Sequence, residues 1–263
     1  MPIQPRKADA RPVDRRIERD YRVRFDEAGE SGHLRSSGFL RYAQDLAWIH
    51  SESAGFGRDW YAGRGLTWLV RTIELHILDD VAYGAALTVS TEVVGFRRVW
   101  ARRRSEFVER GAGRTLAVAL TDWVLLNARG VPMRVPAEIL DVFPAPPADY
   151  TPARLELPET PPDAERTTIS PRHADLDPMG HVNNAVYLDY LEEHLALVGR
   201  RAAIRRRPRR YRAEFLDAAQ QGTVLTGEGW PANSGYAFRL RGPAGAELLR
   251  ARIEIDSASW VGG

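Results

Sequence analysis

Two stretches of the chain repeat apolar residues at helical spacing, and each lies among segments in which apolar and polar residues alternate. In the first half, the apolar residues at this spacing are Phe39, Tyr42, Ala43, Leu46 and Ile49. They predict an amphipathic helix of about five turns. Ser36 or Ser37 would cap its start and Gly55 would end it. A second helix is predicted over residues 184–198.

The alternating segments predict long β-strands around both helices. In the first half they cover residues 19–25, 66–78, 86–96, 98–110 and 115–127. In the second half they cover residues 165–173, 209–216, 223–230, 236–242 and 247–257. The order of strand, helix and four further strands therefore occurs twice.

A proline-rich stretch separates the two halves. Seven of the 17 prolines fall within residues 144–162, and such a stretch can enter neither a helix interior nor a central strand. Shifting one half by 148 residues places GHLRSSGFLRY (32–42) on GHVNNAVYLDY (180–190). We therefore expect an N-terminal extension (1–18), a first module (19–143), a linker (144–163) and a second module (164–263). The predicted fold is α+β, with two antiparallel sheets each wrapped around a long helix.

The composition indicates a globular protein that works without cysteine chemistry. Of the 263 residues 44% are hydrophobic, no apolar run is long enough to span a membrane, and the N-terminal segment lacks the apolar centre of a signal peptide. We expect a cytoplasmic protein without membrane association. The absence of cysteine excludes disulfides and thiolate nucleophiles. A net charge of +2 is too small to indicate nucleic acid binding, and no phosphate-binding or zinc-binding motif occurs, so we expect no cofactor and no metal.

The turn before the second predicted helix gathers four polar side chains, Asp177, His181, Asn183 and Asn184. Free N–H groups at a helix N-terminus can polarise a carbonyl or hold an oxyanion. Asp177 is a candidate general base or nucleophile, His181 a candidate orienting group and Asn183 a candidate oxyanion donor. Taken singly, each could instead be a helix cap or a solvated turn residue.

The first half offers an internal control for this turn. At the 148-residue offset, Asp177 falls on Gly29, Asn183 on Arg35 and Asn184 on Ser36, while His181 falls on His33. One copy keeps the polar set and the other has lost it. This asymmetry favours one active copy and one structural or substrate-holding copy.

The segment LDPMGHVNNAVYLDYLEE resembles the turn and helix of hot-dog acyl thioesterases, and the chain from Arg19 onward is similar to the double-hot-dog acyl-ACP thioesterases. In the first half, RVRFDEAGESG, GLTWLVRTIEL and TDWVLLNARGVPMRVPAEI fall in the order that this family has. The resemblance implies a tandem hot-dog fold and hydrolysis of fatty acyl-ACP, whose carrier is an acidic protein partner, to a free fatty acid and a thiol.

The same resemblance assigns catalytic roles residue by residue. The family's catalytic Asp and His fall on Asp177 and His181, and the Asn between them falls on Met179, so its role is either missing or taken over by Asn183 or water. The family's YRREC resembles YRAEF, which places its catalytic Glu on Glu214. From spacing alone, Glu214 would be a solvent-facing strand residue balancing Arg210 or Arg212.

Two further groups of residues are candidates for binding substrate and carrier. Asn184, Trp68 and Trp48 are the predicted substrate-binding residues, with the indoles lining an acyl tunnel, although aromatic residues at such positions are more often plain core. Residues 199–212 hold eight arginines and could dock the acidic carrier through a diffuse positive field. A solvated arginine-rich loop is the alternative.

Three functional alternatives stay open at this stage. The chain could hydrolyse acyl-CoA instead of acyl-ACP, or bind acyl thioesters without hydrolysing them. A hydratase of the same fold spaces its Asp and His one residue further apart, so the DPMGH spacing argues against it. Association of two chains into a homodimer through their sheets is also left open.

Overall fold

The computed structural model describes residues 14–143, 152, 154–232 and 235–255. Their strands form one ten-stranded antiparallel sheet with the order β1-β3-β4-β5-β2-β7-β10-β9-β8-β6. The first-half strands are β1 (Arg16–Arg22), β2 (Leu66–Ile77), β3 (Ala86–Arg97), β4 (Trp100–Glu109) and β5 (Thr115–Asn127). The second-half strands are β6 (Glu165–Ile169), β7 (Arg209–Phe215), β8 (Leu225–Ala232), β9 (Gly235–Arg241) and β10 (Glu247–Ile255).

The two halves meet edge to edge at β2 and β7. These strands pair antiparallel from Thr72 opposite Glu214 to Ile77 opposite Arg209. Each half therefore contributes its own strands to a single continuous sheet, where the sequence predicted two separate ones. Joining the halves in this way satisfies the backbone groups of two strands that would otherwise be sheet edges.

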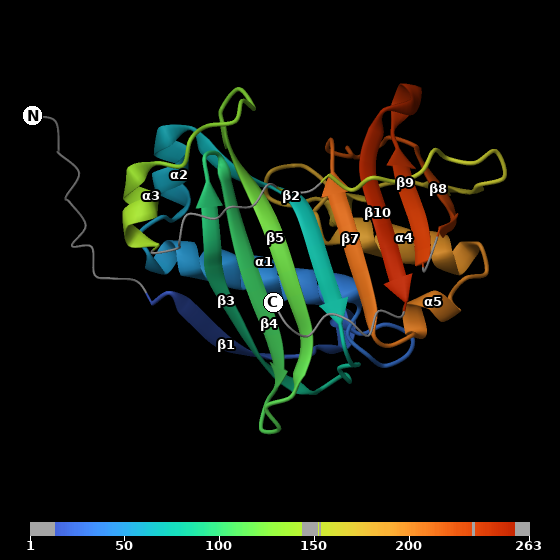
Figure 1. The fold of residues 1–263 in the computed structure, drawn as a ribbon, viewed down its shortest axis with the longest axis horizontal. Helices are drawn as coiled ribbons and strands as arrows, with labels where there is room; N and C mark the ends of the chain where they lie inside the picture. Colours follow the sequence, from blue (N-terminus) through green and yellow to red (C-terminus); the bar gives the residue numbers. More distant parts are fainter. Residues whose placement is uncertain (1–13, 144–151, 153, 233–234, 256–263) are drawn as a thin grey trace, which may run out of the picture.

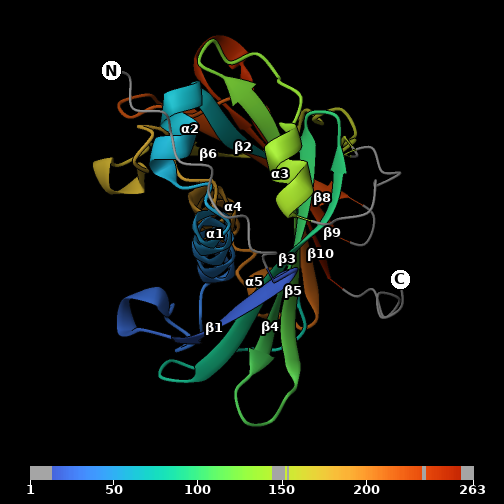
Figure 2. The same ribbon diagram turned by 90° about the vertical axis from the view of Figure 1, so that its left-hand side faces the viewer.

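Both long helices, α1 (Ser36–Ser53) and α4 (Val186–Leu197), lie on the same face of the sheet (Figures 1 and 2). The sequence placed both within two residues of their ends, but missed the short helices α2 (Arg58–Arg64), α3 (Ala137–Val142) and α5 (Ala202–Arg205). The 3-10 turns are η1 (Phe25–Glu27), η2 (His173–Asp175) and η3 (Pro243–Gly245). None of the helices in the described ranges is long and apolar enough to cross a membrane.

The apolar stripe of each long helix packs on the sheet. Phe39 of α1 meets Phe107 of β4 edge to face, with ring centroids 5.1 Å apart, and Leu46 is fully buried. In α4, Tyr187 meets Phe215 of β7 in the same manner at 5.3 Å. Each such aromatic pair contributes roughly 1 kcal/mol beyond the area it buries.

The start of α1 differs from the sequence-based prediction. Arg35 is the N-cap residue, and no side chain caps the helix. Ser36 is the first helical residue, and its hydroxyl is instead hydrogen-bonded to Glu192 of α4 at 2.7 Å. The serine therefore links the two long helices and does not cap the helix it begins.

The hydrogen bonds that build the two pre-helix turns recur 148 residues apart. Arg35 N–H donates to Glu27 C=O at 3.1 Å, and Asn183 N–H donates to Asp175 C=O at 2.9 Å. Tyr42 donates to the Glu27 carboxylate at 2.5 Å, and its counterpart Tyr190 donates to Asp175 at 2.9 Å. The internal repeat read from the sequence is thus present at the level of individual contacts.

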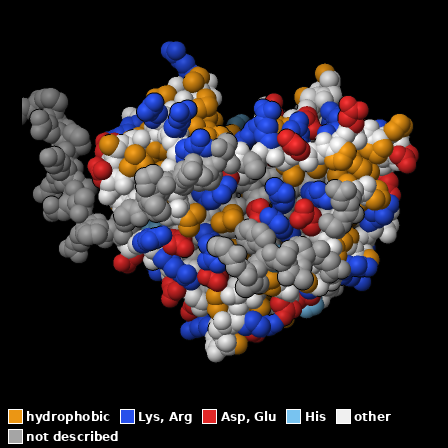
Figure 3. Space-filling view, viewed as in Figure 1, with side chains coloured by type: hydrophobic (Ala, Val, Ile, Leu, Met, Phe, Trp, Pro, Cys, Tyr) orange, Lys and Arg blue, Asp and Glu red, His pale blue; other side chains and the backbone are white. Residues whose placement is uncertain are grey.

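The outer face of the sheet, opposite the helices, carries arginines and carboxylates in close alternation (Figure 3). On this face Arg102 of β4 forms a two-point ion pair with Asp122 of β5, at 2.7 and 2.8 Å. Residues 144–151 and 153 of the predicted linker, 144–163, lie outside the described ranges. In its described part, Leu155 and Leu157 are held against this face. The predicted extension over 1–18 lies mostly outside the described residues.

Candidate active site

Asp177 stands in the turn ahead of α4 with one carboxylate oxygen engaged in its own turn. Its Oδ1 accepts the N–H of Met179 at 2.9 Å, and its own N–H donates to the carbonyl of His181 at 2.9 Å. Asp177 and His181 are partly buried, whereas the Met179 side chain is 50% exposed. Within the described part of the chain no hydrogen bond uses the second Asp177 oxygen, so it is available to water or to a ligand.

The turn ahead of α1 has the same backbone geometry, with Gly29 at the position of Asp177. Gly29 N–H donates to His33 C=O at 2.9 Å, as Asp177 N–H does to His181 C=O. Gly32 N–H donates to Gly29 C=O at 3.0 Å, as Gly180 N–H does to Asp177 C=O at 2.9 Å. The turn therefore forms with glycine in the position of Asp177, and the fold alone does not account for the Asp177 side chain.

The two asparagines that follow have different surroundings. Asn183 accepts the N–H of Ala185 at 2.9 Å through its side-chain oxygen and donates to Gln44 of α1 at 3.2 Å through its nitrogen. It therefore holds the turn ahead of α4 and ties that turn to α1, whereas the N-cap residue of α4 is Ala185. Asn184 lines a pocket instead, and its amide forms no side-chain hydrogen bond with any described residue.

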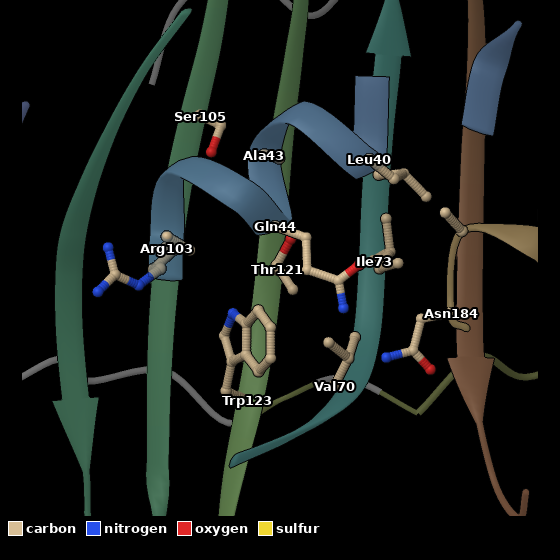
Figure 4. Close-up of a pocket in the computed structure, with 12 residues that line it drawn as sticks. Leu40, Ala43, Gln44, Val70, Ile73, Arg103, Ser105, Thr121, Trp123 and Asn184 are labelled. Carbon is tan, nitrogen blue, oxygen red and sulfur yellow. The ribbon is translucent and has the colours of Figure 1, made fainter. Parts of the chain in front are cut away.

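The pocket lies between α1 and the inner face of β2, β4 and β5 and ends at the start of α4 (Figure 4). Its cavity volume is about 20 Å³, and the wider space around it, including the part open to solvent, is about 350 Å³. The residues that line it are Leu40, Ala43, Gln44, Ala47, Val70, Ile73, Arg103, Ser105, Thr121, Trp123, Asn184 and Ala185. The first half of the chain thus supplies most of the walls, and the second half supplies the end where Asn184 stands.

Neither indole proposed from the sequence lines this pocket. Trp68 donates to the Tyr61 hydroxyl at 3.1 Å and packs with a separate apolar cluster around Phe56 and Phe143. Trp48 is 42% exposed on α1. The indole in the pocket wall is that of Trp123, which sequence reasoning missed. Its place in the strand TLAVALTDWVLLN, on the same face as Thr121 and Ala119, could have indicated that it faces α1.

The structure does not bring Glu214 to the Asp177 turn. Ala213 and Phe215 on either side of it face the helices, so Glu214 points to the outer face of β7. There it is 2% exposed, accepts from Arg71 at 3.1 Å and from the N–H of Leu155 at 3.0 Å, and lies 3.9 Å from Arg250. Its partners also differ from Arg210 and Arg212, the arginines that spacing suggested.

Tyr187 lies close to the Asp177 turn, and its surroundings keep its hydroxyl protonated. Burial raises its pKa to about 12, and the nearby carboxylates of Asp217 and Asp177 act in the same direction. Its hydroxyl oxygen accepts the N–H of Ala219 at 2.8 Å. Within the described residues, no three His, Asp or Glu side chains cluster closely enough to hold a metal ion.

Two family models match the chain in tandem. The model of the acyl-ACP thioesterase N-terminal domain matches residues 14–143, and that of the C-terminal domain matches residues 159–251. The chain belongs to the acyl-ACP thioesterase family. The palmitoyl-acyl carrier protein thioesterase of Arabidopsis thaliana is 26% identical over 269 residues, covering 90% of this chain and 63% of the relative. An acyl-[acyl-carrier-protein] hydrolase of Cuphea viscosissima is 26% identical over 188 residues, covering 66% of this chain and 46% of the relative.

Solved structures agree with this family assignment at the level of the fold. An acyl-ACP thioesterase from Bacteroides thetaiotaomicron superposes with a TM-score of 0.76 at 16% identity, covering 92% of this chain and 98% of that one. The 12:0-ACP thioesterase from Umbellularia californica superposes with a TM-score of 0.75 at 20% identity, covering 92% and 97%. The fold is the α+β double hot-dog. The chain spans about half to two thirds of the length of the two plant relatives named above.

In this member of the acyl-ACP thioesterase family, the end of the pocket near Gln44 and Asn184 has a related position in the other half of the molecule. Side chains fill that position. The 148-residue offset relates Gln44 to Glu192 and Asn184 to Ser36. Ser36 donates to Glu192, Tyr211 donates to the same carboxylate oxygen, and Arg209 donates to Ser36 at 2.7 Å and to Tyr211 at 2.8 Å. Burial raises the pKa of Glu192. This cluster occupies the place where the other half has its pocket.

The arginine-rich run of 199–212 is largely engaged within the molecule. Arg201 and Arg205 pair with Glu30 at 3.2 and 2.9 Å, and Arg207 pairs with Asp80. Both carboxylates belong to the first half, so these pairs join the halves at the end of α5. Surface pairs of this kind contribute about 1 kcal/mol or less each. The run therefore has a structural role in addition to any part in carrier docking.

Proposed function

We propose that this protein hydrolyses a fatty acyl-ACP thioester to a free fatty acid and the carrier thiol, with Asp177 as the carboxylate that the reaction needs. The observation that carries the proposal is the comparison of the two turns. The same backbone hydrogen bonds form around Gly29 and around Asp177, so the turn forms without a carboxylate at this position, and one oxygen of Asp177 is left unused by the turn. A partly buried acid with an unengaged oxygen, in the turn that leads to the pocket residue Asn184, is a candidate for chemistry.

The arrangement supports a division of work between the halves. The acyl chain would lie in the pocket under α1, and the thioester carbonyl would lie at the start of α4 beside Asn184. There the Asn184 amide and the partial positive charge of the helix N-terminus favour the oxyanion that develops on the carbonyl oxygen. Asn183, whose amide already bonds Ala185 and Gln44, would position α4 against α1.

Two routes to hydrolysis are consistent with Asp177. As a general base it takes a proton from water, whose oxygen bonds to the carbonyl carbon while the C–S bond breaks and the carrier thiol leaves. As a nucleophile its oxygen bonds to the carbonyl carbon while the C–S bond breaks, the carrier leaves as a thiolate that takes up a proton, and water then cleaves the mixed anhydride to release the fatty acid and restore Asp177. His181, four residues on in the same turn, would orient the water or the substrate. Oxygen-18 incorporation during a single turnover separates the two routes.

Glu214 is proposed here as a positioning residue that fixes β7 and the segment at Leu155. This differs from the catalytic role that the family resemblance implied, because its carboxylate faces the side of the sheet away from α4. Trp48 and Trp68 are likewise proposed to support the first half, since Trp123 is the indole in the pocket wall.

The experiment measures free-thiol release from a panel of acyl-ACP and acyl-CoA substrates. We expect turnover with acyl-ACP, and a loss of about 100-fold or more in kcat for Asp177→Asn, since general acid–base groups contribute on that scale. Asp26→Asn, an exposed carboxylate ahead of the other helix, is the matched control and should keep wild-type turnover. Turnover on acyl-CoA alone would support the acyl-CoA thioesterase. Tight binding of acyl thioesters without thiol release would support a non-hydrolytic binding protein.

A further inference from the structure

The end of the pocket furthest from Asn184 has polar residues in its wall, Arg103, Ser105 and Thr121, whereas the rest of the lining is mostly apolar. From the start of α4 the pocket passes Val70 and Ile73 on β2, then Thr121 and Trp123 on β5, and reaches Arg103 on β4 (Figure 4). Two strand spacings separate β2 from β4, so the polar end lies roughly 10 Å beyond the apolar β2 wall.

Arg103 is a cation in the pocket wall with neutral partners. Its Nη1 donates to Nδ1 of His50 at 3.1 Å, and its guanidinium lies 5.7 Å from the centre of the Phe143 ring. Burial lowers the pKa of Arg103 to about 10, so it stays charged at neutral pH. Among the residues that the structure describes, no carboxylate forms an ion pair with it.

His50 cannot serve as the missing counter-charge. Burial, helped by the charge of Arg103, lowers the pKa of His50 to about 4, so the imidazole is neutral at pH 7. Its Nε2 bonds the carbonyl of Asp14 at 2.9 Å and must donate there, which leaves Nδ1 to accept from Arg103. The pair is a neutral imidazole holding a cation in place.

Trp123 adds a second donor at the same end. Its indole nitrogen is buried and has no hydrogen-bond partner among the described residues. In the register of β4 and β5, Arg103 lies opposite Thr121 and Trp123 is the next residue on that face, so the two side chains are diagonal neighbours. Figure 4 shows the edge of the indole that carries the nitrogen turned to the Arg103 side, away from Asn184.

We propose that the acyl chain this pocket takes carries an oxygen acceptor, best a carboxylate, at its end remote from the thioester, where Arg103 and Trp123 receive it. This inference rests on the proposed function, because it names the substrate class of the same site. A plain alkyl end would leave the indole N–H unpaired and the cation without a counter-charge. Each unpaired buried donor costs about 1–3 kcal/mol, and a buried cation more. A carboxylate would satisfy both donors at once.

The test compares thiol release from three acyl-ACP substrates of equal chain length, ending in a methyl, a hydroxyl or a carboxylate. We expect wild type to favour the carboxylate over the methyl end by about tenfold or more in kcat/KM, which corresponds to one charge-assisted hydrogen bond. Arg103→Met should remove or reverse this preference. Trp123→Phe, which keeps a ring but loses the N–H, should weaken it. Arg104→Met is the matched control, since Arg104 faces the other side of β4 and pairs with Glu106.

The outcomes are separable. A preference for the hydroxyl end that depends on Trp123 and not on Arg103 would support the acceptor but identify it as neutral. A wild type that favours the methyl end, or an Arg103→Met variant with unchanged ratios, would overturn the inference while leaving the thioesterase in place. Failure to hydrolyse any substrate, by wild type at any chain length, would instead overturn the proposed function on which it rests.

Discussion

At the scale of single residues, the candidate chemistry lies in one turn, and the walls of the pocket come from α1 and from β2, β4 and β5. Asp177, His181, Asn183 and Asn184 could be grouped because they are contiguous in one turn, and local spacing fixes where a turn side chain stands relative to the helix after it. Trp48 and Trp68 could not be placed, because the side that a residue faces depends on how α1 and the short helix α2 pack, and α2 has no strong periodicity.

Glu214 gives a sharp prediction at this scale. The alternation of Tyr211, Ala213 and Phe215 already indicated that Glu214 points to the opposite face, but not that Arg71 and Leu155 would bury it there. We expect Glu214→Gln to lower the free energy of unfolding by about 1–3 kcal/mol, since it removes the charge from a buried, hydrogen-bonded carboxylate.

Thermal unfolding and thiol release check this together. The folded variant should keep the kcat of wild type while its Tm falls. Arg71→Met should show the same pattern, because it removes the partner of the carboxylate. A large loss of kcat at an unchanged Tm would restore the catalytic role that the family resemblance assigned to Glu214.

At the scale of elements, α4 is fixed to the sheet by a buried imidazole. Thr167 of β6 bonds Nδ1 of His194 at 2.8 Å, and Tyr236 of β9 bonds Nε2 at 2.9 Å. Tyr236 in turn donates to Glu165, which pairs with Arg200 at 2.7 Å. The sequence predicted α4 and both strands but could not predict this network, because its members come from four segments that only the fold brings together.

The network makes stability depend on pH in a defined window. Burial lowers the pKa of His194 to about 4, and that of His50 likewise, whereas an unfolded histidine has a pKa of about 6.5. Between these values the unfolded chain binds protons that the folded chain does not, so stability falls as pH drops from about 6.5 towards 4.

Chemical denaturation across this pH range measures the effect. His194→Gln should lower stability at pH 7 and reduce the slope of stability against pH by about a third to a half, because it removes one of three histidines, with His50 and His76, whose pKa burial lowers. Exchange of the exposed His173 for Gln is the control and should leave the slope as it is. A slope that His194→Gln does not change would show that other groups govern the acid side of the stability curve.

At the scale of the whole molecule, the two halves of the duplicated chain differ from each other. One sheet carries two related turns and two related places between helix and sheet, yet the position of Asp177 has a carboxylate in the turn ahead of α4 and a glycine in the turn ahead of α1, and the pocket described above lies under α1. The Glu192 and Arg209 cluster fills the other place.

The strands, both long helices and the repeat could be predicted from periodicity. The continuous sheet and the filled pocket could not, because they depend on how β2 meets β7 and how α1 meets α4.

The central claim is that the two related turns differ in function. Asp177→Gly tests this claim most directly, because it gives the turn ahead of α4 the residue that the turn ahead of α1 has at the same position. The measurement is kcat for acyl-ACP hydrolysis alongside the free energy of unfolding of the same preparation. We expect stability to fall by no more than about 1 kcal/mol, the usual cost of introducing a glycine, while kcat falls by about 100-fold or more. Retained turnover, or unfolding that accounts for all of the lost activity, would contradict the claim.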